Sequence, residues 1–292
     1  MKLTWIDLKF NKYKVVQPLC RIGEDGDSSI FYRCDDVIAD ISHISVGDEV
    51  EFKFEKRNRE YIRKMVANGT LQNLTKSWFK KASKYEYSYH FNWLGRPIIQ
   101  FPQDIISMQE IIWHVKPDLI IETGIAHGGS LIFYASMLEL LGGDGKVLGI
   151  DIDIRERNRK EIENHSMFKR ITMIEGSSID KGIAKQVWDF AKEKKNVLVV
   201  LDSNHTHEHV LKELKLYSSL VAKNSYLIVF DTIIEDMPED FFPDRPWGKG
   251  NNPKTAVWEF LKTNNRFEID KEIENKLLIT VAPDGYLKCI KE

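Results

Sequence analysis

Five short apolar runs, each followed by a helical pattern of apolar residues, occupy most of the chain beyond residue 104. The runs cover residues 119–121, 147–150, 171–174, 197–201 and 226–230. Short apolar runs bounded by polar turns are typical of strands that are buried on both faces. Alternating strands and helices favour a doubly wound, mostly parallel sheet. The sequence therefore predicts an α/β domain over residues 104–292.

Both ends of this domain carry further signals. Asp104 is placed to cap a helix whose apolar face recurs at helical spacing up to Val115, and Pro117 ends that helix. Near the C-terminus, residues 277–282 and 286–290 are apolar and flank the tripeptide Pro-Asp-Gly. This pattern predicts a terminal strand and turn.

The first 103 residues follow a different pattern. Residues 13–16, 30–32 and 49–54 predict short strands and residues 61–67 predict a helix, so residues 1–66 are interpreted as a small β-rich extension. Residues 67–103 are rich in aromatic side chains and predict a linker or lid. We expect the extension to serve docking or oligomerisation, and the protein to form a homo-oligomer.

Composition excludes several classes of partner. Lys and Arg number 42 and Asp and Glu number 44, so the formal net charge of -2 gives no reason to expect a nucleic-acid partner or an anionic membrane. No apolar run is long enough for a membrane span, and the first ten residues lack a signal-peptide core. Cys20, Cys34 and Cys289 show no zinc or disulfide spacing, which favours a cytoplasmic protein.

Ligands of open α/β sheets bind at the carboxyl ends of the strands, so the residues after each predicted strand are the candidates for a site. Glycines that let the backbone approach a ligand follow the first strand. Their spacing is not that of a dinucleotide-binding or phosphate-binding loop, and the wider loop suits a cofactor without a pyrophosphate. A purely structural loop is the alternative. The candidate cofactor-binding residues here are Glu122, Thr123, Gly124, His127, Gly128 and Ser130.

The second and third strands add candidates for the nucleoside part of such a cofactor. Asp151 stands at the tip of the second strand, where a carboxylate can accept the ribose hydroxyl hydrogens, whereas Asp153 is better explained as a turn residue. Gly176, Ser177 and Ser178 follow the third strand and can hold an adenine edge. A helix cap explains the serines equally well.

Acidic residues follow the fourth and fifth strands. Asp202 and Asp231 can converge beside the cofactor, and with the Thr232 hydroxyl they form an oxygen site suited to Mg²⁺. Such an ion would hold a substrate hydroxyl and lower its pKa. His205, three residues after Asp202, can take the proton, so Asp202 and His205 are the candidate catalytic residues. The alternative places His205, like the two histidines after it, at the solvated start of a helix.

Arg245 and Trp247 lie in a glycine-containing loop after the fifth strand, where they can stack on or clamp a substrate. The alternative is a rigid surface loop without a binding role.

From about residue 78 onward, the chain resembles the cephalosporin hydroxylase / rhamnosyl O-methyltransferase family. The resemblance is carried by residues 93–97 (WLGRP), 122–130 (ETGIAHGGS), 149–153 (GIDID), 201–210 (LDSNHTHEHV), 246–248, 252–257 and 283–287. The resemblance implies a class I methyltransferase fold with a seven-stranded sheet and S-adenosylmethionine as cofactor. It also implies transfer of the cofactor's methyl group to a hydroxyl of a small-molecule or glycan acceptor, such as a sugar in polysaccharide biosynthesis.

The resemblance extends to the metal and the base, with one departure. Compared with catechol-type enzymes, Asp202, Asp231 and Thr232 fall at metal-ligand positions and His205 falls at the position of a basic catalytic lysine. Related antibiotic-pathway proteins have an acidic residue just before the second metal aspartate, where this chain has Phe230. Two alternatives stay open: a nicotinamide-dependent oxidoreductase, and a non-catalytic cofactor-binding module.

Overall fold

The computed structural model describes residues 19–21, 29–31 and 46–292, and the chain divides into two compact units, Met1–Asn58 and Arg59–Glu292. In the first unit, strands β1 (Leu19–Arg21) and β2 (Ser29–Phe31) pair antiparallel. The strand predicted over residues 30–32 therefore coincides with β2 at residues 30 and 31. The strand predicted over residues 13–16 lies outside the described residues.

Helix α1 (Val46–Ala67) corrects one prediction and confirms another. The segment 49–54, predicted as a strand, is helical, whereas the helix over residues 61–67 is confirmed. The alternation of Val50, Phe52 and Phe54 imitates a strand, but the segment continues into a run of Glu, Lys and Arg, which are good helix formers. Lys64 also pairs with Glu60 at 2.7 Å, one helical turn away.

The second unit contains the predicted α/β sheet, with seven strands. In spatial order they are β10 (Phe267–Ile269), β11 (Tyr286–Cys289), β9 (Tyr226–Val229), β8 (Val197–Leu201), β5 (Leu119–Thr123), β6 (Lys146–Asp151) and β7 (Ile171–Glu175). Strands β9, β8, β5, β6 and β7 are parallel, and β11 runs antiparallel to both of its neighbours. The predicted doubly wound, mostly parallel sheet is confirmed.

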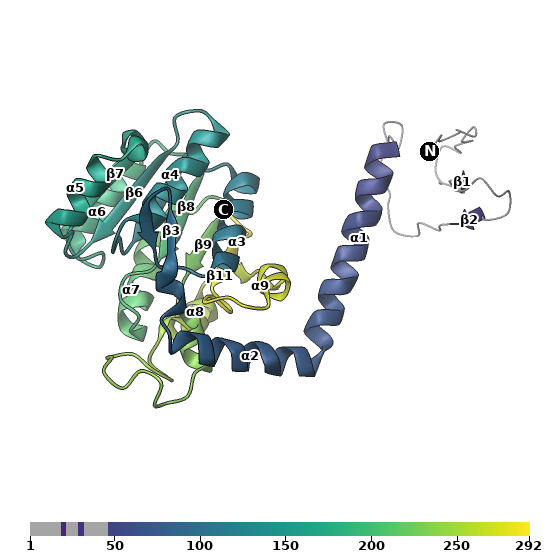
Figure 1. Cartoon of the computed structure of the whole chain (residues 1–292). Coiled ribbons are helices and arrows are strands. Elements are labelled where there is room, and N and C mark those ends of the chain that lie inside the picture. Colours follow the sequence, from purple (N-terminus) through teal and green to yellow (C-terminus); the bar gives the residue numbers. More distant parts are fainter. Residues whose placement is uncertain (1–18, 22–28, 32–45) are drawn as a thin grey trace. The chain divides into compact units, whose positions relative to one another are not determined.

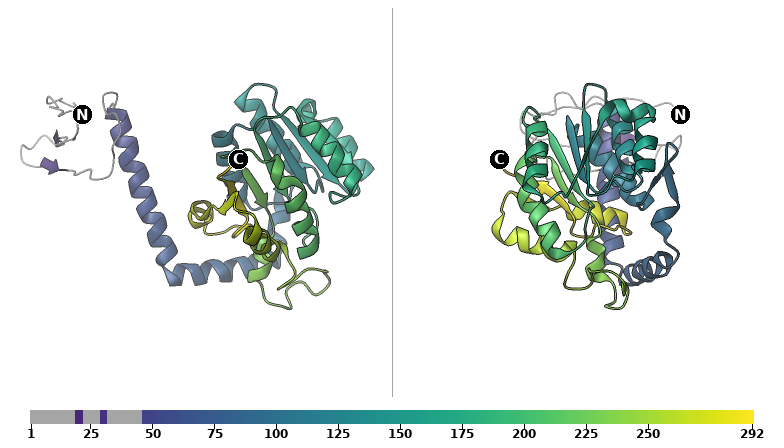
Figure 2. Two further views of the ribbon diagram at one scale, coloured as in Figure 1. Left: turned by 180° about the vertical axis from the view of Figure 1, so that it is seen from behind. Right: turned by 90° about the vertical axis from the view of Figure 1, so that its left-hand side faces the viewer.

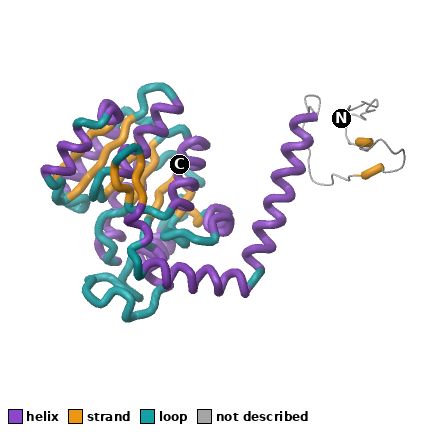
Figure 3. Tube along the Cα trace, in the orientation of Figure 1, coloured by secondary structure: helices purple, strands orange, loops and turns teal. Residues whose placement is uncertain are grey.

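Helices cover both faces of this sheet, as Figures 1 and 3 show and as Figure 2 shows from two further directions. One apolar cluster joins the sheet to α3 (Pro102–Val115) and α4 (Gly129–Leu141). A second cluster joins it to α6 (Lys181–Ala191), α7 (His207–Tyr217) and α8 (Pro253–Thr263). Shorter helices along this part of the chain are α5 (Glu156–Glu163), α9 (Lys271–Leu277), η3 (Ser166–Arg170), η4 (Ser218–Leu220) and η5 (Thr232–Asp236).

The ends of the α/β domain differ from their predictions. Asp104 does not cap α3, which begins at Pro102; its fully buried carboxylate accepts hydrogen bonds from the Thr280 and Tyr286 hydroxyls and the Val281 amide. The strand predicted over residues 277–282 is wrong, because Leu277 ends α9 and no strand follows before β11. Strand β11 itself was predicted.

The aromatic-rich segment folds into helices and a hairpin. It contains α2 (Gly69–Ser83), η2 (Tyr87–His90), β3 (Phe91–Trp93) and β4 (Arg96–Ile98). The Trp93 indole donates to the Ser136 hydroxyl at 3.0 Å, and the Arg96 guanidinium donates to the His127 carbonyl at 2.6 Å. Both bonds fix the β3–β4 hairpin against the loop and helix that follow β5. Among the described residues, no helix has both the length and the apolar character to cross a bilayer.

Candidate active site

A cavity of about 740 Å³ opens at the carboxyl ends of the parallel strands. Each of the five parallel strands contributes to its wall a residue that lies at its end or within three residues after it: Gly124, Asp151, Ser178, Asp202 and Asp231. The parallel strands end at the same edge of the sheet, so residues far apart in the chain meet there. The structure thus brings together the strand-tip residues that the sequence marked as candidates.

Close backbone contacts explain the glycines of the loop after β5. Gly124 has φ +93°, and a Cβ atom on it would lie 2.1 Å from the Asp202 carbonyl oxygen. Gly128 has φ +81°, and its Cβ would lie 2.3 Å from Ile162. Glycine alone fits such positions. His127 and Ser130 of this loop line the cavity.

Asp151 holds this loop in place. Its Oδ2 accepts hydrogen bonds from the backbone amides of Ile125 at 2.8 Å and Ala126 at 3.2 Å, and its Oδ1 accepts one from the Asp153 amide at 3.1 Å. A carboxylate offers about four acceptor sites. One site on Oδ1 therefore stays available to a ligand, fewer than the sequence interpretation assumed.

Four predicted cofactor-binding residues stand behind the cavity wall. Among the described residues that line the cavity, Glu122, Thr123, Gly128 and Gly176 are absent. Glu122 and Thr123 are buried in the sheet, and the Ser130 hydroxyl donates to Glu122 Oε2 at 2.6 Å. Glu122 therefore supports Ser130, which itself lines the cavity.

Burial raises the pKa of Glu122 from 4.5 to about 8, against the opposing effect of hydrogen bonds from Ser130 and Tyr134. The folded state therefore binds this proton more tightly than the unfolded state, and it loses stability as the pH rises from 4.5 to 8. Glu122→Gln mimics the protonated acid. The wild type should lose stability across this window and the variant should not. The free energy of unfolding of the variant, relative to that of the wild type, should therefore rise by up to ~1.4 kcal/mol per pH unit. Urea unfolding at pH 5 and pH 8 measures the gain, and parallel pH profiles would contradict it.

A buried carboxylate from α7 organises the wall after β7. Glu213 is fully buried, and its Oε1 accepts hydrogen bonds from the Ser178 hydroxyl at 2.6 Å and the Ser203 hydroxyl at 2.7 Å. His209 Nε2 lies 3.1 Å from the Ser178 hydroxyl. Ser177, Ser178, Ser203 and His209 line the cavity. Sequence reasoning missed Glu213 and Ser203, and it assigned His209 to solvent.

An acidic cluster with one histidine lies after β8 and β9. One ligand atom from each of Asp202, His205 and Asp231 lies within 4.8 Å of the other two, and His205 Nε2 is 3.0 Å from Asp231 Oδ2. Burial, and after it the nearby Asp231 carboxylate, hold the pKa of Asp202 well above its usual range. A cation between the two carboxylates would favour their ionised forms, so the donor set fits a divalent cation.

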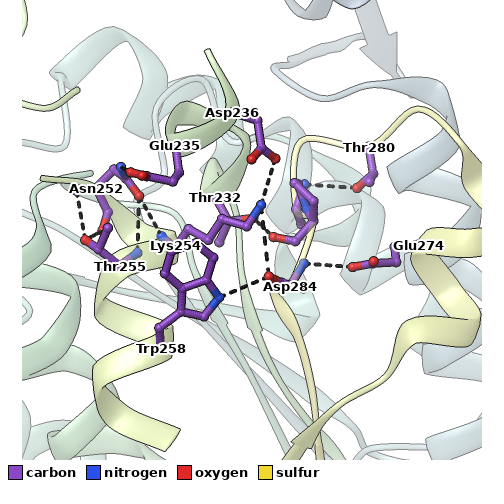
Figure 4. A network of polar contacts seen from close by, with 12 residues as sticks. Thr232, Glu235, Asp236, Asn252, Lys254, Thr255, Trp258, Glu274, Thr280 and Asp284 are labelled. Carbon is purple, nitrogen blue, oxygen red and sulfur yellow. Dashed lines mark hydrogen bonds and ion pairs between the residues drawn. The ribbon is translucent and has the colours of Figure 1, made fainter. Parts of the chain in front are cut away.

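Thr232 does not join this cluster. It is fully buried, and its hydroxyl donates to the Pro283 carbonyl at 2.6 Å. Figure 4 shows it within a polar network in which the Lys254 ammonium contacts Asp236 at 2.7 Å. The prediction that Thr232 is a metal ligand is therefore corrected: its hydroxyl bonds the loop before β11 instead. Phe230 is buried in the core.

Arg245 and Trp247, in the loop after η5, lie beside the acidic cluster. The Trp247 ring meets the His205 ring edge-on at 4.8 Å between centroids, and the Arg245 guanidinium lies 5.3 Å from the centre of the Trp247 ring. Both residues line the cavity.

Residues outside the strand tips also line the cavity. The aromatic-rich segment contributes Phe79, Tyr87, Tyr89 and Phe101, and the segment after β4 contributes Gln100. The clustering of aromatic residues indicated a lid in the sequence, but no local signal singled out Gln100.

Comparisons with known proteins agree with this geometry. Residues 85–290 match the family described as Rhamnosyl O-methyltransferase/CmcI. The chain is 32% identical over 191 residues to the rhamnosyl O-methyltransferase of Mycobacterium tuberculosis (strain H37Rv), covering 63% of this chain and 72% of that protein. It is 28% identical over 235 residues to that of Mycobacterium leprae, covering 78% of this chain and 98% of that protein.

A solved structure shares the fold. The apo structure of CmcI-N160 aligns with a TM-score of 0.50 at 19% identity, covering 70% of this chain and 78% of that chain. This likeness concerns the fold; the family match over residues 85–290 decides against the nicotinamide-dependent alternative. With its family and fold shown, the chain belongs to the rhamnosyl O-methyltransferase/CmcI family and is an S-adenosylmethionine-dependent O-methyltransferase.

Proposed function

We propose that this protein transfers the methyl group of S-adenosylmethionine to a sugar hydroxyl, assisted by a divalent cation such as Mg²⁺. The observation that carries the proposal is the position of the Asp202, His205 and Asp231 cluster in the same cavity as the glycine loop after β5. Cofactor and acceptor can then meet in one enclosed space, and the relatives named above act on a rhamnosyl group.

The cofactor would occupy the side of the cavity nearest β5, β6 and β7. The free acceptor site of Asp151 Oδ1 suits a ribose hydroxyl. Ser177 and Ser178 suit the base, and His127 and Ser130 suit the methionine part. Asp202 follows β8, which lies between β5 and β9 in the sheet, so it can face both the cofactor and the cation.

Asp202 and Asp231 would hold the cation, with waters and further oxygen atoms in place of Thr232. When bound, the cation would hold the acceptor hydroxyl and lower its pKa. The two carboxylates would bind and orient it; their ligand atoms lie within 4.8 Å of each other, so small side-chain movements would bring both to the ~2.1 Å bond length of one Mg²⁺ ion.

His205 would accept the proton of the acceptor hydroxyl. A neutral His205 that donates from Nε2 to Asp231 Oδ2 keeps its other ring nitrogen free to accept a proton. The ring is held by the edge contact with Trp247. When bound, S-adenosylmethionine would supply an electrophilic methyl group to the acceptor oxygen and leave as S-adenosylhomocysteine, and proximity in the cavity would lower the barrier.

The acceptor would lie against the aromatic walls. Trp247, Arg245, Tyr87 and Tyr89 all line the cavity and provide flat surfaces with polar edges, which suit the mixed faces of a sugar ring.

Turnover should depend on a divalent cation. The test uses S-adenosylmethionine with a labelled methyl group and rhamnose-containing acceptors, assayed with Mg²⁺ and with a chelator. We expect the chelator to lower turnover by at least ~100-fold, because Lewis-acid stabilisation contributes several kcal/mol, and Mg²⁺ to restore it. Full turnover in chelator would remove the cation from the mechanism, and failure to label any hydroxylated sugar would overturn the proposed acceptor.

A further inference from the structure

Gln100 stands in the cavity wall with half of its side chain unsatisfied. The residue is 7% exposed and lines the cavity, yet its amide oxygen Oε1 has no hydrogen-bond partner. Buried polar atoms without partners are rare in proteins because each one loses its hydrogen bonds to water. The amide oxygen is closed off from the cavity where it stands, so it gains a partner only if the amide turns.

The other half of the same amide points to the acidic cluster. Gln100 Nε2 lies 3.5 Å from Asp202 Oδ2. With the amide nitrogen toward the carboxylate, as here, the two groups form a weak contact. With the amide oxygen in that position, two acceptor oxygens would face each other and repel unless a cation lay between them. A half-turn about the last side-chain torsion exchanges the two atoms, and that torsion is broad.

The spacing matches that of two oxygen ligands of one ion. Neighbouring ligands of octahedral Mg²⁺ lie ~3 Å apart, because each bond is ~2.1 Å long. After the half-turn, the Gln100 oxygen would occupy the position 3.5 Å from Asp202 Oδ2. Small movements of either side chain are enough to close the remaining gap.

The backbone around Gln100 is fixed in place. The preceding hairpin is tied to the His127 carbonyl by Arg96, and a Cβ atom on Gly129 would lie 2.1 Å from the Pro97 carbonyl oxygen. Phe101, the next residue, is buried. Gln100 therefore reaches the cluster from a rigid support, as a ligand needs to.

We infer that Gln100 is an additional ligand of the divalent cation, contributing its amide oxygen beside Asp202 and Asp231. This inference rests on the cation proposed above. The cation would turn the Gln100 amide so that the oxygen faces Asp202, and removal of the cation would let the nitrogen return.

Binding of Mn²⁺ to the full-length protein tests the inference without any turnover. We expect Gln100→Leu, which removes the oxygen, to weaken Mn²⁺ binding about tenfold or more, and Gln100→Glu, which adds a charge, to strengthen it by a similar factor. Gln103→Leu is the matched control, since Gln103 Oε1 is also buried without a partner but does not line the cavity. It should leave Mn²⁺ affinity within twofold of the wild type.

The titrations follow free Mn²⁺ by electron paramagnetic resonance, and binding of S-adenosylhomocysteine reports folding. Equal Mn²⁺ affinity of the wild type and Gln100→Leu would overturn the inference about Gln100 and leave the proposed cation site standing. Absence of Mn²⁺ binding by the wild type would overturn the cation proposal as well. If Gln100→Leu does not fold, Gln100→Glu decides: an affinity no higher than that of the wild type contradicts the inference.

Discussion

His205→Ala should lower the rate of methyl transfer by ~10²–10⁴, the usual contribution of a general base. The ring nitrogen that takes the proton disappears, whereas the residues that line the cofactor side of the cavity are unchanged. Affinity for S-adenosylhomocysteine should therefore stay within about threefold, a difference below ~1 kcal/mol. Single-turnover kinetics with saturating cofactor measure the rate, and calorimetry measures the affinity.

Two further variants separate proton transfer from simple packing. His205→Gln keeps a donor for Asp231 but has no nitrogen that accepts a proton, so it should be as slow as His205→Ala. His207 contacts Thr255 and Glu259 and does not line the cavity, so His207→Ala should keep a nearly normal rate. Normal turnover by His205→Gln, or equal loss in both alanine variants, would show that His205 is not the base.

Gly124→Ala should destabilise the protein by about 3–5 kcal/mol. Its Cβ would lie 2.1 Å from the Asp202 carbonyl oxygen and would force β5 and β8 apart at their tips, in addition to the ~1–2 kcal/mol of strain at positive φ. Because Asp202 moves with that carbonyl, binding of Mn²⁺ and of S-adenosylhomocysteine should weaken as well. Urea unfolding measures the free energy of unfolding.

Gly95→Ala isolates the backbone strain from the collision. Gly95 has φ +87°, close to that of Gly124, but no atom lies within 4 Å of an added Cβ. This variant should lose only the ~1–2 kcal/mol expected for a left-handed residue and keep its ligand affinities. Equal destabilisation by the two substitutions would mean that contact with Asp202 has no part in holding the strand tips together.

The predicted metal ligands show which site residues can be inferred from strand order alone. Asp202 and Asp231 were placed together from the sequence because adjacent parallel strands end at one edge, and this holds whatever the side chains around them do. The same reasoning gave a wrong prediction for the neighbouring Thr232. One residue further along, the chain has turned into η5, and its hydroxyl faces Pro283.

The apolar runs and the glycine spacing determined the fold by themselves. A strand buried on both faces must be apolar along its length, and a backbone with positive φ against another strand must be glycine, so contiguous residues carry these signals. The segment 49–54 shows the limit of such local signals. Its period-two pattern lasts for only six residues, and the helix formers that follow decide its structure.

Only the tertiary structure decided which side chains support the strand tips. Gln100 and Asp202 are separated by 102 residues, and Ser178 and Glu213 by 35, yet each pair is in contact. Such contacts depend on how hairpin, helix and sheet pack, and nothing in the residues next to Gln100 or Glu213 distinguishes them from any other buried amide or acid. The sequence by itself therefore determined the sheet and the residues at its edge, whereas packing between distant segments selected their partners.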